Sequence, residues 1–167
     1  DKSILDKFDL KKKYIVLCPD SEYGPAKKWP INKWIDLANS IQKSYQVVFV
    51  GLDSAIASST SKIMTNNCVN LIGKTSLNDA IIILSQSTCV VSNDSGLMHI
   101  AAAVKTPLVA LYGPSSPEYT PPLISKKKIL RKTQGYEKVR YGSNEKGYHQ
   151  SLLDIKPEEV LNALEEL

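Results

Sequence analysis

Short apolar runs alternate with amphipathic stretches along most of this chain of 167 residues. Apolar runs of about five residues bounded by turn residues are typical of buried strands, whereas apolar residues three or four apart are typical of helices. The predicted strands are Tyr14–Cys18, Gln46–Val50, Val69–Ile72, Cys89–Ser92, Leu108–Tyr112 and an edge strand within Ile124–Lys132. The predicted helices are Ile31–Lys43, Ala55–Thr65, Leu77–Ser85, Leu97–Val104 and Pro157–Leu167.

Strands that alternate with helices predict a doubly wound, Rossmann-like α/β domain with a mainly parallel sheet of about six strands. The length of the chain suits a single domain. Residues 1–13 are polar and charged, and we interpret them as the remnant of an interdomain linker. Residues 14–167 then form the domain itself. The segment 133–151 has little periodicity and is predicted to be a long ordered loop with a functional role.

The turn Asn93-Asp94-Ser95-Gly96 leads from a predicted strand directly into a predicted helix. The first N–H groups of a helix lack intrahelical partners, and the helix dipole adds roughly half a positive charge there. The backbone of Ser95, Gly96 and Leu97 is therefore a candidate phosphate site at the carboxyl edge of the sheet. The alternative is that the side chains of Asp94 and Ser95 only cap the helix.

Two other loops follow predicted strands and reach the same edge. Lys27 and Lys28 bring two cations to the first loop, which suits a pyrophosphate, although both could be ordinary exposed lysines. Asp53 follows the second strand, where an acid often accepts ribose hydroxyls, but the slightly favoured alternative is that Asp53 or Ser54 caps the next helix. Ser76 and Asp79 predict a capping box for the helix that begins at Leu77.

Composition and motif spacing exclude several classes of protein. The net charge of +4 is modest, and no aromatic-interleaved basic patch indicates nucleic acid as a partner. The lysine clusters at 11–13 and 126–128 either flank strands in contact with solvent or attract an anionic substrate or membrane face.

The three cysteines lack metal-ligand spacing and are predicted to be reduced core residues of a cytoplasmic protein. No apolar run approaches the length of about 18 residues that a membrane span needs.

The residues in and after the turn Asn93-Asp94-Ser95-Gly96 also raise the possibility of a serine hydrolase. Asp94, Ser95 and His99 are the residue types of a catalytic triad. However, Ser95 lacks the Gly-x-Ser-x-Gly elbow, and the three residues lie too close together in the chain for that fold. We therefore interpret His99 as a residue that steadies the turn or reaches a bound ligand.

Three motifs occur in an order that resembles a known family. N-D-S-G-x-x-H-x-A-A-A is followed by P-L-V-A-L-Y-G-P-S-S-P, and both lie between the stretches Pro19–Pro30 and Gly147–Ile155. Together they resemble the lipopolysaccharide heptosyltransferases, which are inverting, metal-independent glycosyltransferases of the two-domain GT-B fold. The resemblance implies that this chain is the C-terminal, donor-binding half of such an enzyme. The Gly147–Ile155 motif is similar to that of members which add the second heptose.

The resemblance also assigns expected roles to individual residues. The donor phosphates are expected at Lys27, Ser95, Gly96 and Leu97, and the donor sugar at Asp94 and His99. The residues expected on the nucleoside side are Ser21, Glu22, Asp53, Lys74 and Thr75. The residues of the long loop expected to face the donor or the acceptor are Lys138, Arg140, His149 and Gln150. The catalytic base is expected in the N-terminal domain, so no catalytic residue is assigned here.

The implied function is transfer of heptose from ADP-L-glycero-β-D-manno-heptose to the lipopolysaccharide inner core, without a metal or other cofactor. The implied partners are the donor, the inner-core acceptor and the protein's own N-terminal acceptor domain. The implied location is the cytoplasm, with peripheral contact at the inner face of the inner membrane. Two alternatives stay open: another GT-B enzyme such as a nucleotide-sugar epimerase, which would prefer UDP, and a nucleotide-sugar-binding domain without catalysis.

Overall fold

The computed structural model describes residues 2–60 and 66–167. Its strands are β1 (Tyr14–Cys18), β2 (Gln46–Phe49), β3 (Cys68–Asn70), β4 (Cys89–Asn93), β5 (Leu108–Tyr112) and β6 (Lys127–Arg131). Its helices are α1 (Lys2–Lys7), the 3-10 helix η1 (Pro25–Lys27), α2 (Ile31–Ile41), α3 (Ser54–Thr60), α4 (Leu77–Gln86), α5 (Gly96–Ala103), α6 (Gln150–Leu153) and α7 (Pro157–Glu165).

The described strands form one six-stranded sheet in the order β3-β2-β1-β4-β5-β6. Every neighbouring pair is parallel, which confirms the predicted parallel sheet and the predicted edge position of the last strand. The strand order reverses between β1 and β4. In open α/β sheets, the crevice outside the carboxyl ends of the strands at such a reversal is where ligands bind.

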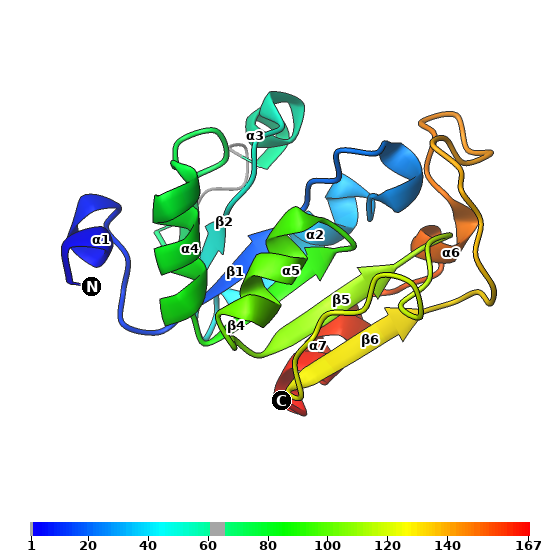
Figure 1. The fold of residues 1–167 in the computed structure, drawn as a ribbon. Coiled ribbons are helices and arrows are strands. Elements are labelled where there is room, and N and C mark those ends of the chain that lie inside the picture. Colours follow the sequence, from blue (N-terminus) through cyan, green and yellow to red (C-terminus); the bar gives the residue numbers. More distant parts are fainter. Residues whose placement is uncertain (1, 61–65) are drawn as a thin grey trace.

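Helices cover both faces of the sheet (Figure 1). Alternate residues of each strand point to opposite faces, so Tyr14 and Val16 belong to one buried cluster while Ile15 and Leu17 belong to the other. The first cluster packs under α4 and α5, and the second packs under α2 and α7. Burial on both faces explains why β1 and β5 carry apolar or aromatic residues along their whole length.

The N-terminal segment is more structured than its composition predicts. Residues Lys2–Lys7 form α1, in which Ile4 is buried against the core. Lys7 Nζ lies 2.9 Å from Asp79 Oδ2 at the start of α4, which holds α1 against this helix. The segment therefore packs on the domain, and its expected role as a connection to a second domain stays a prediction.

The predicted element boundaries are mostly right within a few residues. The predicted helix Ala55–Thr65 is described as α3 up to Thr60, and its remaining residues 61–65 lie outside the described residues. The third strand ends at Asn70, whose side-chain oxygen accepts a hydrogen bond from the Ile72 N–H at 3.0 Å. This local turn replaces the last two residues of the predicted strand. The capping box of α4 is present as predicted.

No helix among the described residues combines the length and the apolar character needed to cross a membrane.

The three cysteine thiols are free and buried, which confirms the prediction of reduced core residues. Burial raises the pKa of Cys68 to about 11 and that of Cys89 to about 12. Burial, together with the nearby charge of Asp20, also raises the pKa of Cys18. Since the thiolate is the reactive form, all three should react slowly while the protein is folded.

We therefore expect a disulfide reagent such as Ellman's reagent to label almost no thiol in the native protein at pH 8. In guanidinium chloride, it should label all three cysteines. Time-resolved absorbance measures both reactions. Rapid labelling of one thiol in the native protein would contradict the buried placement of that cysteine.

Candidate functional site

The side chain of Asn93 joins the two sides of the crevice. Asn93 ends β4 and is fully enclosed. Its Oδ1 accepts a hydrogen bond from the Trp29 N–H at 3.1 Å, and its Nδ2 donates to the carbonyl oxygens of Pro19 and Asp20 at 2.8 and 3.4 Å. The end of β4 is thereby fixed to the loop that follows β1. Sequence reasoning treated Asn93 only as a turn residue.

The first turn of α5 offers free backbone donors to the crevice. Ser95 is the N-cap residue in an extended conformation, but its side chain makes no capping hydrogen bond. No described residue accepts a hydrogen bond from the N–H groups of Ser95, Gly96 or Leu97. A Cβ atom built on Gly96 would meet nothing within 4 Å, so the space in front of this turn is open. The alternative that Asp94 or Ser95 caps the helix through its side chain is wrong.

Lys27 and Asp94, which lie far apart in the sequence, form an ion pair beside this turn. Lys27 Nζ is 3.2 Å from Asp94 Oδ2, and it lies 5.5 Å from the centre of the Tyr23 ring. Asp94 is 5% exposed, and its Oδ2 also accepts a hydrogen bond from Ser115 Oγ at 2.7 Å. A cation, a carboxylate and the start of a helix therefore meet at one place, as the sequence predicted from separate motifs.

A cavity of about 250 Å³ opens between the end of β2 and the first turns of α4 and α5. Its apolar lining consists of Val50, Leu52, Leu77, Ala80, Leu97 and Ile100. Its polar lining includes Ser21, Glu22, Thr75, Ser76 and Ser95. The expected nucleoside residues Ser21, Glu22 and Thr75 thus share one cavity with the free turn of α5. Lys74 is exposed and does not line this cavity.

Asp53 lies beside the cavity rather than in its lining. Its Oδ1 accepts a hydrogen bond from the Ala55 N–H at 2.9 Å, and its Oδ2 lies 2.8 Å from Lys28 Nζ. The hydrogen bond from Lys28 is the main cause that lowers the pKa of Asp53. The helix-capping interpretation of Asp53 is therefore confirmed, and its contact with a ribose stays a prediction.

Asp20 is a residue of the cavity that sequence reasoning missed. Its Oδ2 accepts hydrogen bonds from the backbone N–H groups of Leu52 and Asp53, the latter at 3.0 Å. Its Oδ1 is enclosed and has no partner among the described residues. Asp20 therefore holds the loop after β2 against the loop after β1. Its position directly after a buried strand and a proline was the available signal.

His99 is exposed, and its side chain makes no hydrogen bond with any described residue. Its expected role in steadying the turn stays a prediction. Its expected contact with a ligand stays a prediction.

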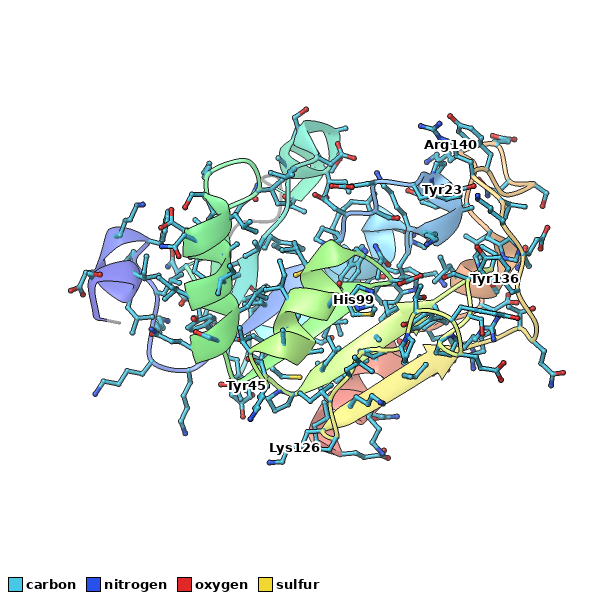
Figure 2. The ribbon with its side chains drawn as sticks, viewed as in Figure 1. Tyr23, Tyr45, His99, Lys126, Tyr136 and Arg140 are labelled. Atoms are coloured by element: carbon cyan, nitrogen blue, oxygen red, sulfur yellow. The ribbon has the colours of Figure 1, made fainter. Side chains whose placement is uncertain are left out.

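The long loop 133–151 runs along the carboxyl end of the sheet (Figure 1). The Arg140 carbonyl accepts a hydrogen bond from the Ala26 N–H at 3.2 Å, which places the loop over η1. In Figure 2, the side chains of Tyr23, Tyr136 and Arg140 gather at one end of the molecule, and those of Tyr45 and Lys126 lie at the other. Lys138 is exposed and makes no hydrogen bond or ion pair with the described residues.

The other two candidates of this loop have local structural roles. His149 is the N-cap of α6, and its Nδ1 accepts a hydrogen bond from the Ser151 N–H at 3.3 Å. Its Nε2 lies 3.5 Å from Glu137 Oε2. Gln150 Nε2 donates to Asp154 Oδ1 at 2.8 Å within the same helical segment. Contacts of either side chain with a donor or acceptor stay predictions.

The described residues contain no group of three or more His, Cys, Asp or Glu side chains that could hold a metal ion. Lys27 and the free N–H groups of α5 bring positive charge to the crevice.

A parallel sheet whose order reverses beside a helix with free N-terminal N–H groups defines a Rossmann-like domain. Solved structures with this fold include GT-B glycosyltransferases. The family described as glycosyltransferase family 9 (heptosyltransferase) matches residues 1–149, and the chain belongs to this family.

Individual relatives agree with this assignment. The chain is 46% identical over 160 residues to lipopolysaccharide heptosyltransferase 2 of Salmonella typhimurium, and this match covers 92% of the chain and 46% of that protein. It is 49% identical over 161 residues to lipooligosaccharide heptosyltransferase 2 of Haemophilus influenzae, with the same coverage. The structure of ADP-heptose lipopolysaccharide heptosyltransferase II from Escherichia coli matches with a TM-score of 0.87 at 40% identity, over 99% of this chain and 50% of that one. The chain thus spans about half the length of these relatives.

Removing the Asn93 side chain should destabilise the protein more than its size suggests. The Asn93→Ala substitution leaves two buried backbone groups and one partly buried carbonyl without this partner, so we expect a loss of about 2 kcal/mol in the free energy of unfolding. Urea unfolding followed by circular dichroism measures the loss. Asn162→Ala is the matched control, because Asn162 is exposed on α7 and its side chain makes no hydrogen bond with the described residues. Equal stability of the two variants would contradict the bridging role of Asn93.

Proposed function

We propose that this chain is the donor-binding part of a glycosyltransferase that transfers L-glycero-D-manno-heptose from ADP-heptose to the lipopolysaccharide inner core, where it adds the second heptose. One observation carries the proposal. Lys27 and Asp94 form an ion pair beside the unpaired N–H groups of the first turn of α5, where the strand order reverses. The identity of 46–49% to proteins named heptosyltransferase 2 supports the choice of sugar and acceptor.

The proposed division of labour follows from the length of the relatives. Residues 14–167 form the nucleotide-sugar-binding domain, and residues 1–13 lead to it from an N-terminal acceptor domain that the relatives' additional length would supply. The general base that deprotonates the acceptor hydroxyl belongs to that domain. The present chain alone therefore binds the donor but does not transfer heptose.

The cavity and the turn of α5 suggest how the donor lies. A cavity of about 250 Å³ with a largely apolar lining suits the adenine ring but not the whole donor. The adenosine then lies near Ser21, Glu22 and Thr75, with Asp53 and Lys74 at its margin. The diphosphate lies over Ser95, Gly96 and Leu97 beside Lys27, and the sugar extends toward Asp94 and His99.

The same groups support the chemistry. When the bond between the anomeric carbon and the diphosphate breaks, negative charge develops on the leaving ADP. The N–H groups of Ser95–Leu97 and the cation of Lys27 are positioned to stabilise that charge, which lowers the barrier without a metal ion. Attack by the acceptor hydroxyl on the opposite face inverts the anomeric carbon.

The proposal extends to partners and location. In this proposal the long loop, with Lys138, Arg140, His149 and Gln150, faces the donor or the inner-core acceptor across the interdomain cleft. The enzyme acts in the cytoplasm, in peripheral contact with the inner face of the inner membrane. The lysine clusters at 11–13 and 126–128 supply positive charge for that contact.

Titration of this chain with ADP, with UDP as the control, tests the proposal. We expect ADP to shift the amide NMR signals of Lys27, Thr75 and Ser95–Leu97, because these residues surround the proposed site. UDP should bind more weakly, since its smaller base leaves apolar lining exposed to water. Preferential UDP binding would favour an epimerase, and a folded protein that binds neither nucleotide would contradict the proposal.

Lys27→Ala tests the phosphate contact. Loss of one charge-assisted hydrogen bond should weaken ADP binding about tenfold, measured by isothermal titration calorimetry. Lys12→Ala is the control, because Lys12 carries the same charge but precedes β1 at the opposite edge of the sheet. Equal ADP affinity in the two variants would show that Lys27 does not contact phosphate.

A further inference from the structure

Three donors converge on a single oxygen atom of Asp94. Ser115 Oγ lies 2.7 Å from Oδ2, Lys27 Nζ lies 3.2 Å from it, and Thr120 Oγ1 lies 3.4 Å from it. No described residue donates a hydrogen bond to the other oxygen, Oδ1. Oδ1 is also absent from the enclosed side-chain atoms without a partner, so the protein does not enclose it completely. The carboxylate therefore has one oxygen bound to the protein and one available to a ligand.

Ser115 makes the shortest of these hydrogen bonds. The hydroxyl of Thr120 also lies 3.3 Å from the Ser116 carbonyl, and its single proton cannot serve both acceptors at once. Lys27 is partly exposed, and in the proposed complex it also faces the diphosphate. Ser115 is 2% exposed and has no other side-chain acceptor among the described residues. Its hydroxyl is thus the donor committed to Asp94.

The loop that carries Ser115 is held from several directions. The Pro114 carbonyl accepts a hydrogen bond from the Glu137 N–H at 2.9 Å. The backbone N–H groups of Tyr119 and Thr120 both donate to the Ser116 carbonyl at 3.1 Å. Ser115 is therefore presented by a fixed turn, and its hydrogen bond can set the rotation of the Asp94 carboxylate.

We propose that Ser115 is a positioning residue for recognition of the donor's sugar. Its hydrogen bond to Oδ2 keeps Oδ1 of Asp94 directed into the crevice, where Oδ1 accepts a hydroxyl group of the sugar attached to the nucleoside diphosphate. This inference rests on the proposed function, in which Asp94 faces the sugar. It assigns to Ser115 a contribution to the preference for the nucleotide sugar over the free nucleotide, and none to nucleotide binding itself.

The test compares two ligands, ADP and ADP-heptose, by calorimetry with this chain. The wild type should bind ADP-heptose more tightly than ADP. In Ser115→Ala, this preference should fall about fivefold while the affinity for ADP stays the same, because only the sugar contact is lost. Ser116→Ala should keep the preference, since Ser116 is equally buried in the same turn but its hydroxyl accepts from the Glu118 N–H and does not touch Asp94.

A double substitution separates positioning from general loosening of the turn. In Asp94→Asn the preference for ADP-heptose should already be lost, so adding Ser115→Ala should change it no further. A further loss in the double variant, or an equal loss in Ser116→Ala, would overturn the positioning role. An unchanged preference in Ser115→Ala would overturn it as well, with the proposed function intact. A wild type that binds ADP-heptose no better than ADP would overturn the proposed recognition of the sugar together with this inference.

Discussion

The crevice depends on the enclosed amide of Asn93, which binds the end of β4 to the loop that follows β1. Its three hydrogen bonds reach Pro19, Asp20 and Trp29, so the whole loop after β1 is fixed to the end of β4. Buried polar groups must be paired, and therefore this loop cannot shift without leaving both sides unsatisfied. Because Lys27 lies within the fixed loop, its distance from Asp94 and from the start of α5 follows from the same contact. Trp29 extends the connection, since its Nε1 donates to the Ile155 carbonyl at 3.0 Å.

Close backbone packing, rather than regular structure, holds the long loop against this framework. Gly24 has a φ of 144°, a region that favours glycine, and a Cβ atom there would lie 2.6 Å from the carbonyl oxygen of Arg140. Gly147 has a φ of 79°, and a Cβ atom there would lie 2.7 Å from Pro25. The two glycines let the segment 133–151 lie directly on η1. The loop is thereby positioned beside Lys27 although it contains almost no helix or strand.

Sequence patterns predicted the strands, which depend on local burial. They missed single polar residues whose roles depend on tertiary contacts. Uninterrupted apolar runs predicted five of the strands closely, because strands covered on both faces have no polar side to show. The cation at Lys27 and the turn at Ser95–Leu97 could be predicted because charge and helix starts are visible in sequence. Asn93, Asp20 and Ser115 could not, since each is an ordinary polar residue until the fold supplies its partner. For the same reason α1 looked like a polar linker: the surface that buries Ile4 is formed in part by α4, which lies far along the chain.

The balance of charge at the crevice bears on how a domain with a modest net charge would attract the proposed diphosphate. Lys27 is neutralised by Asp94 in the ligand-free protein, so the net charge of this pair is zero. The remaining attraction comes from backbone N–H groups, which are oriented at the crevice before any ligand arrives and carry no counter-charge. Ser115 also donates to Asp94, so in the proposed complex this carboxylate keeps a protein donor when Lys27 faces the diphosphate. In the proposed donor complex, the lysine can thus be shared between two anions, because neither anion depends on it alone.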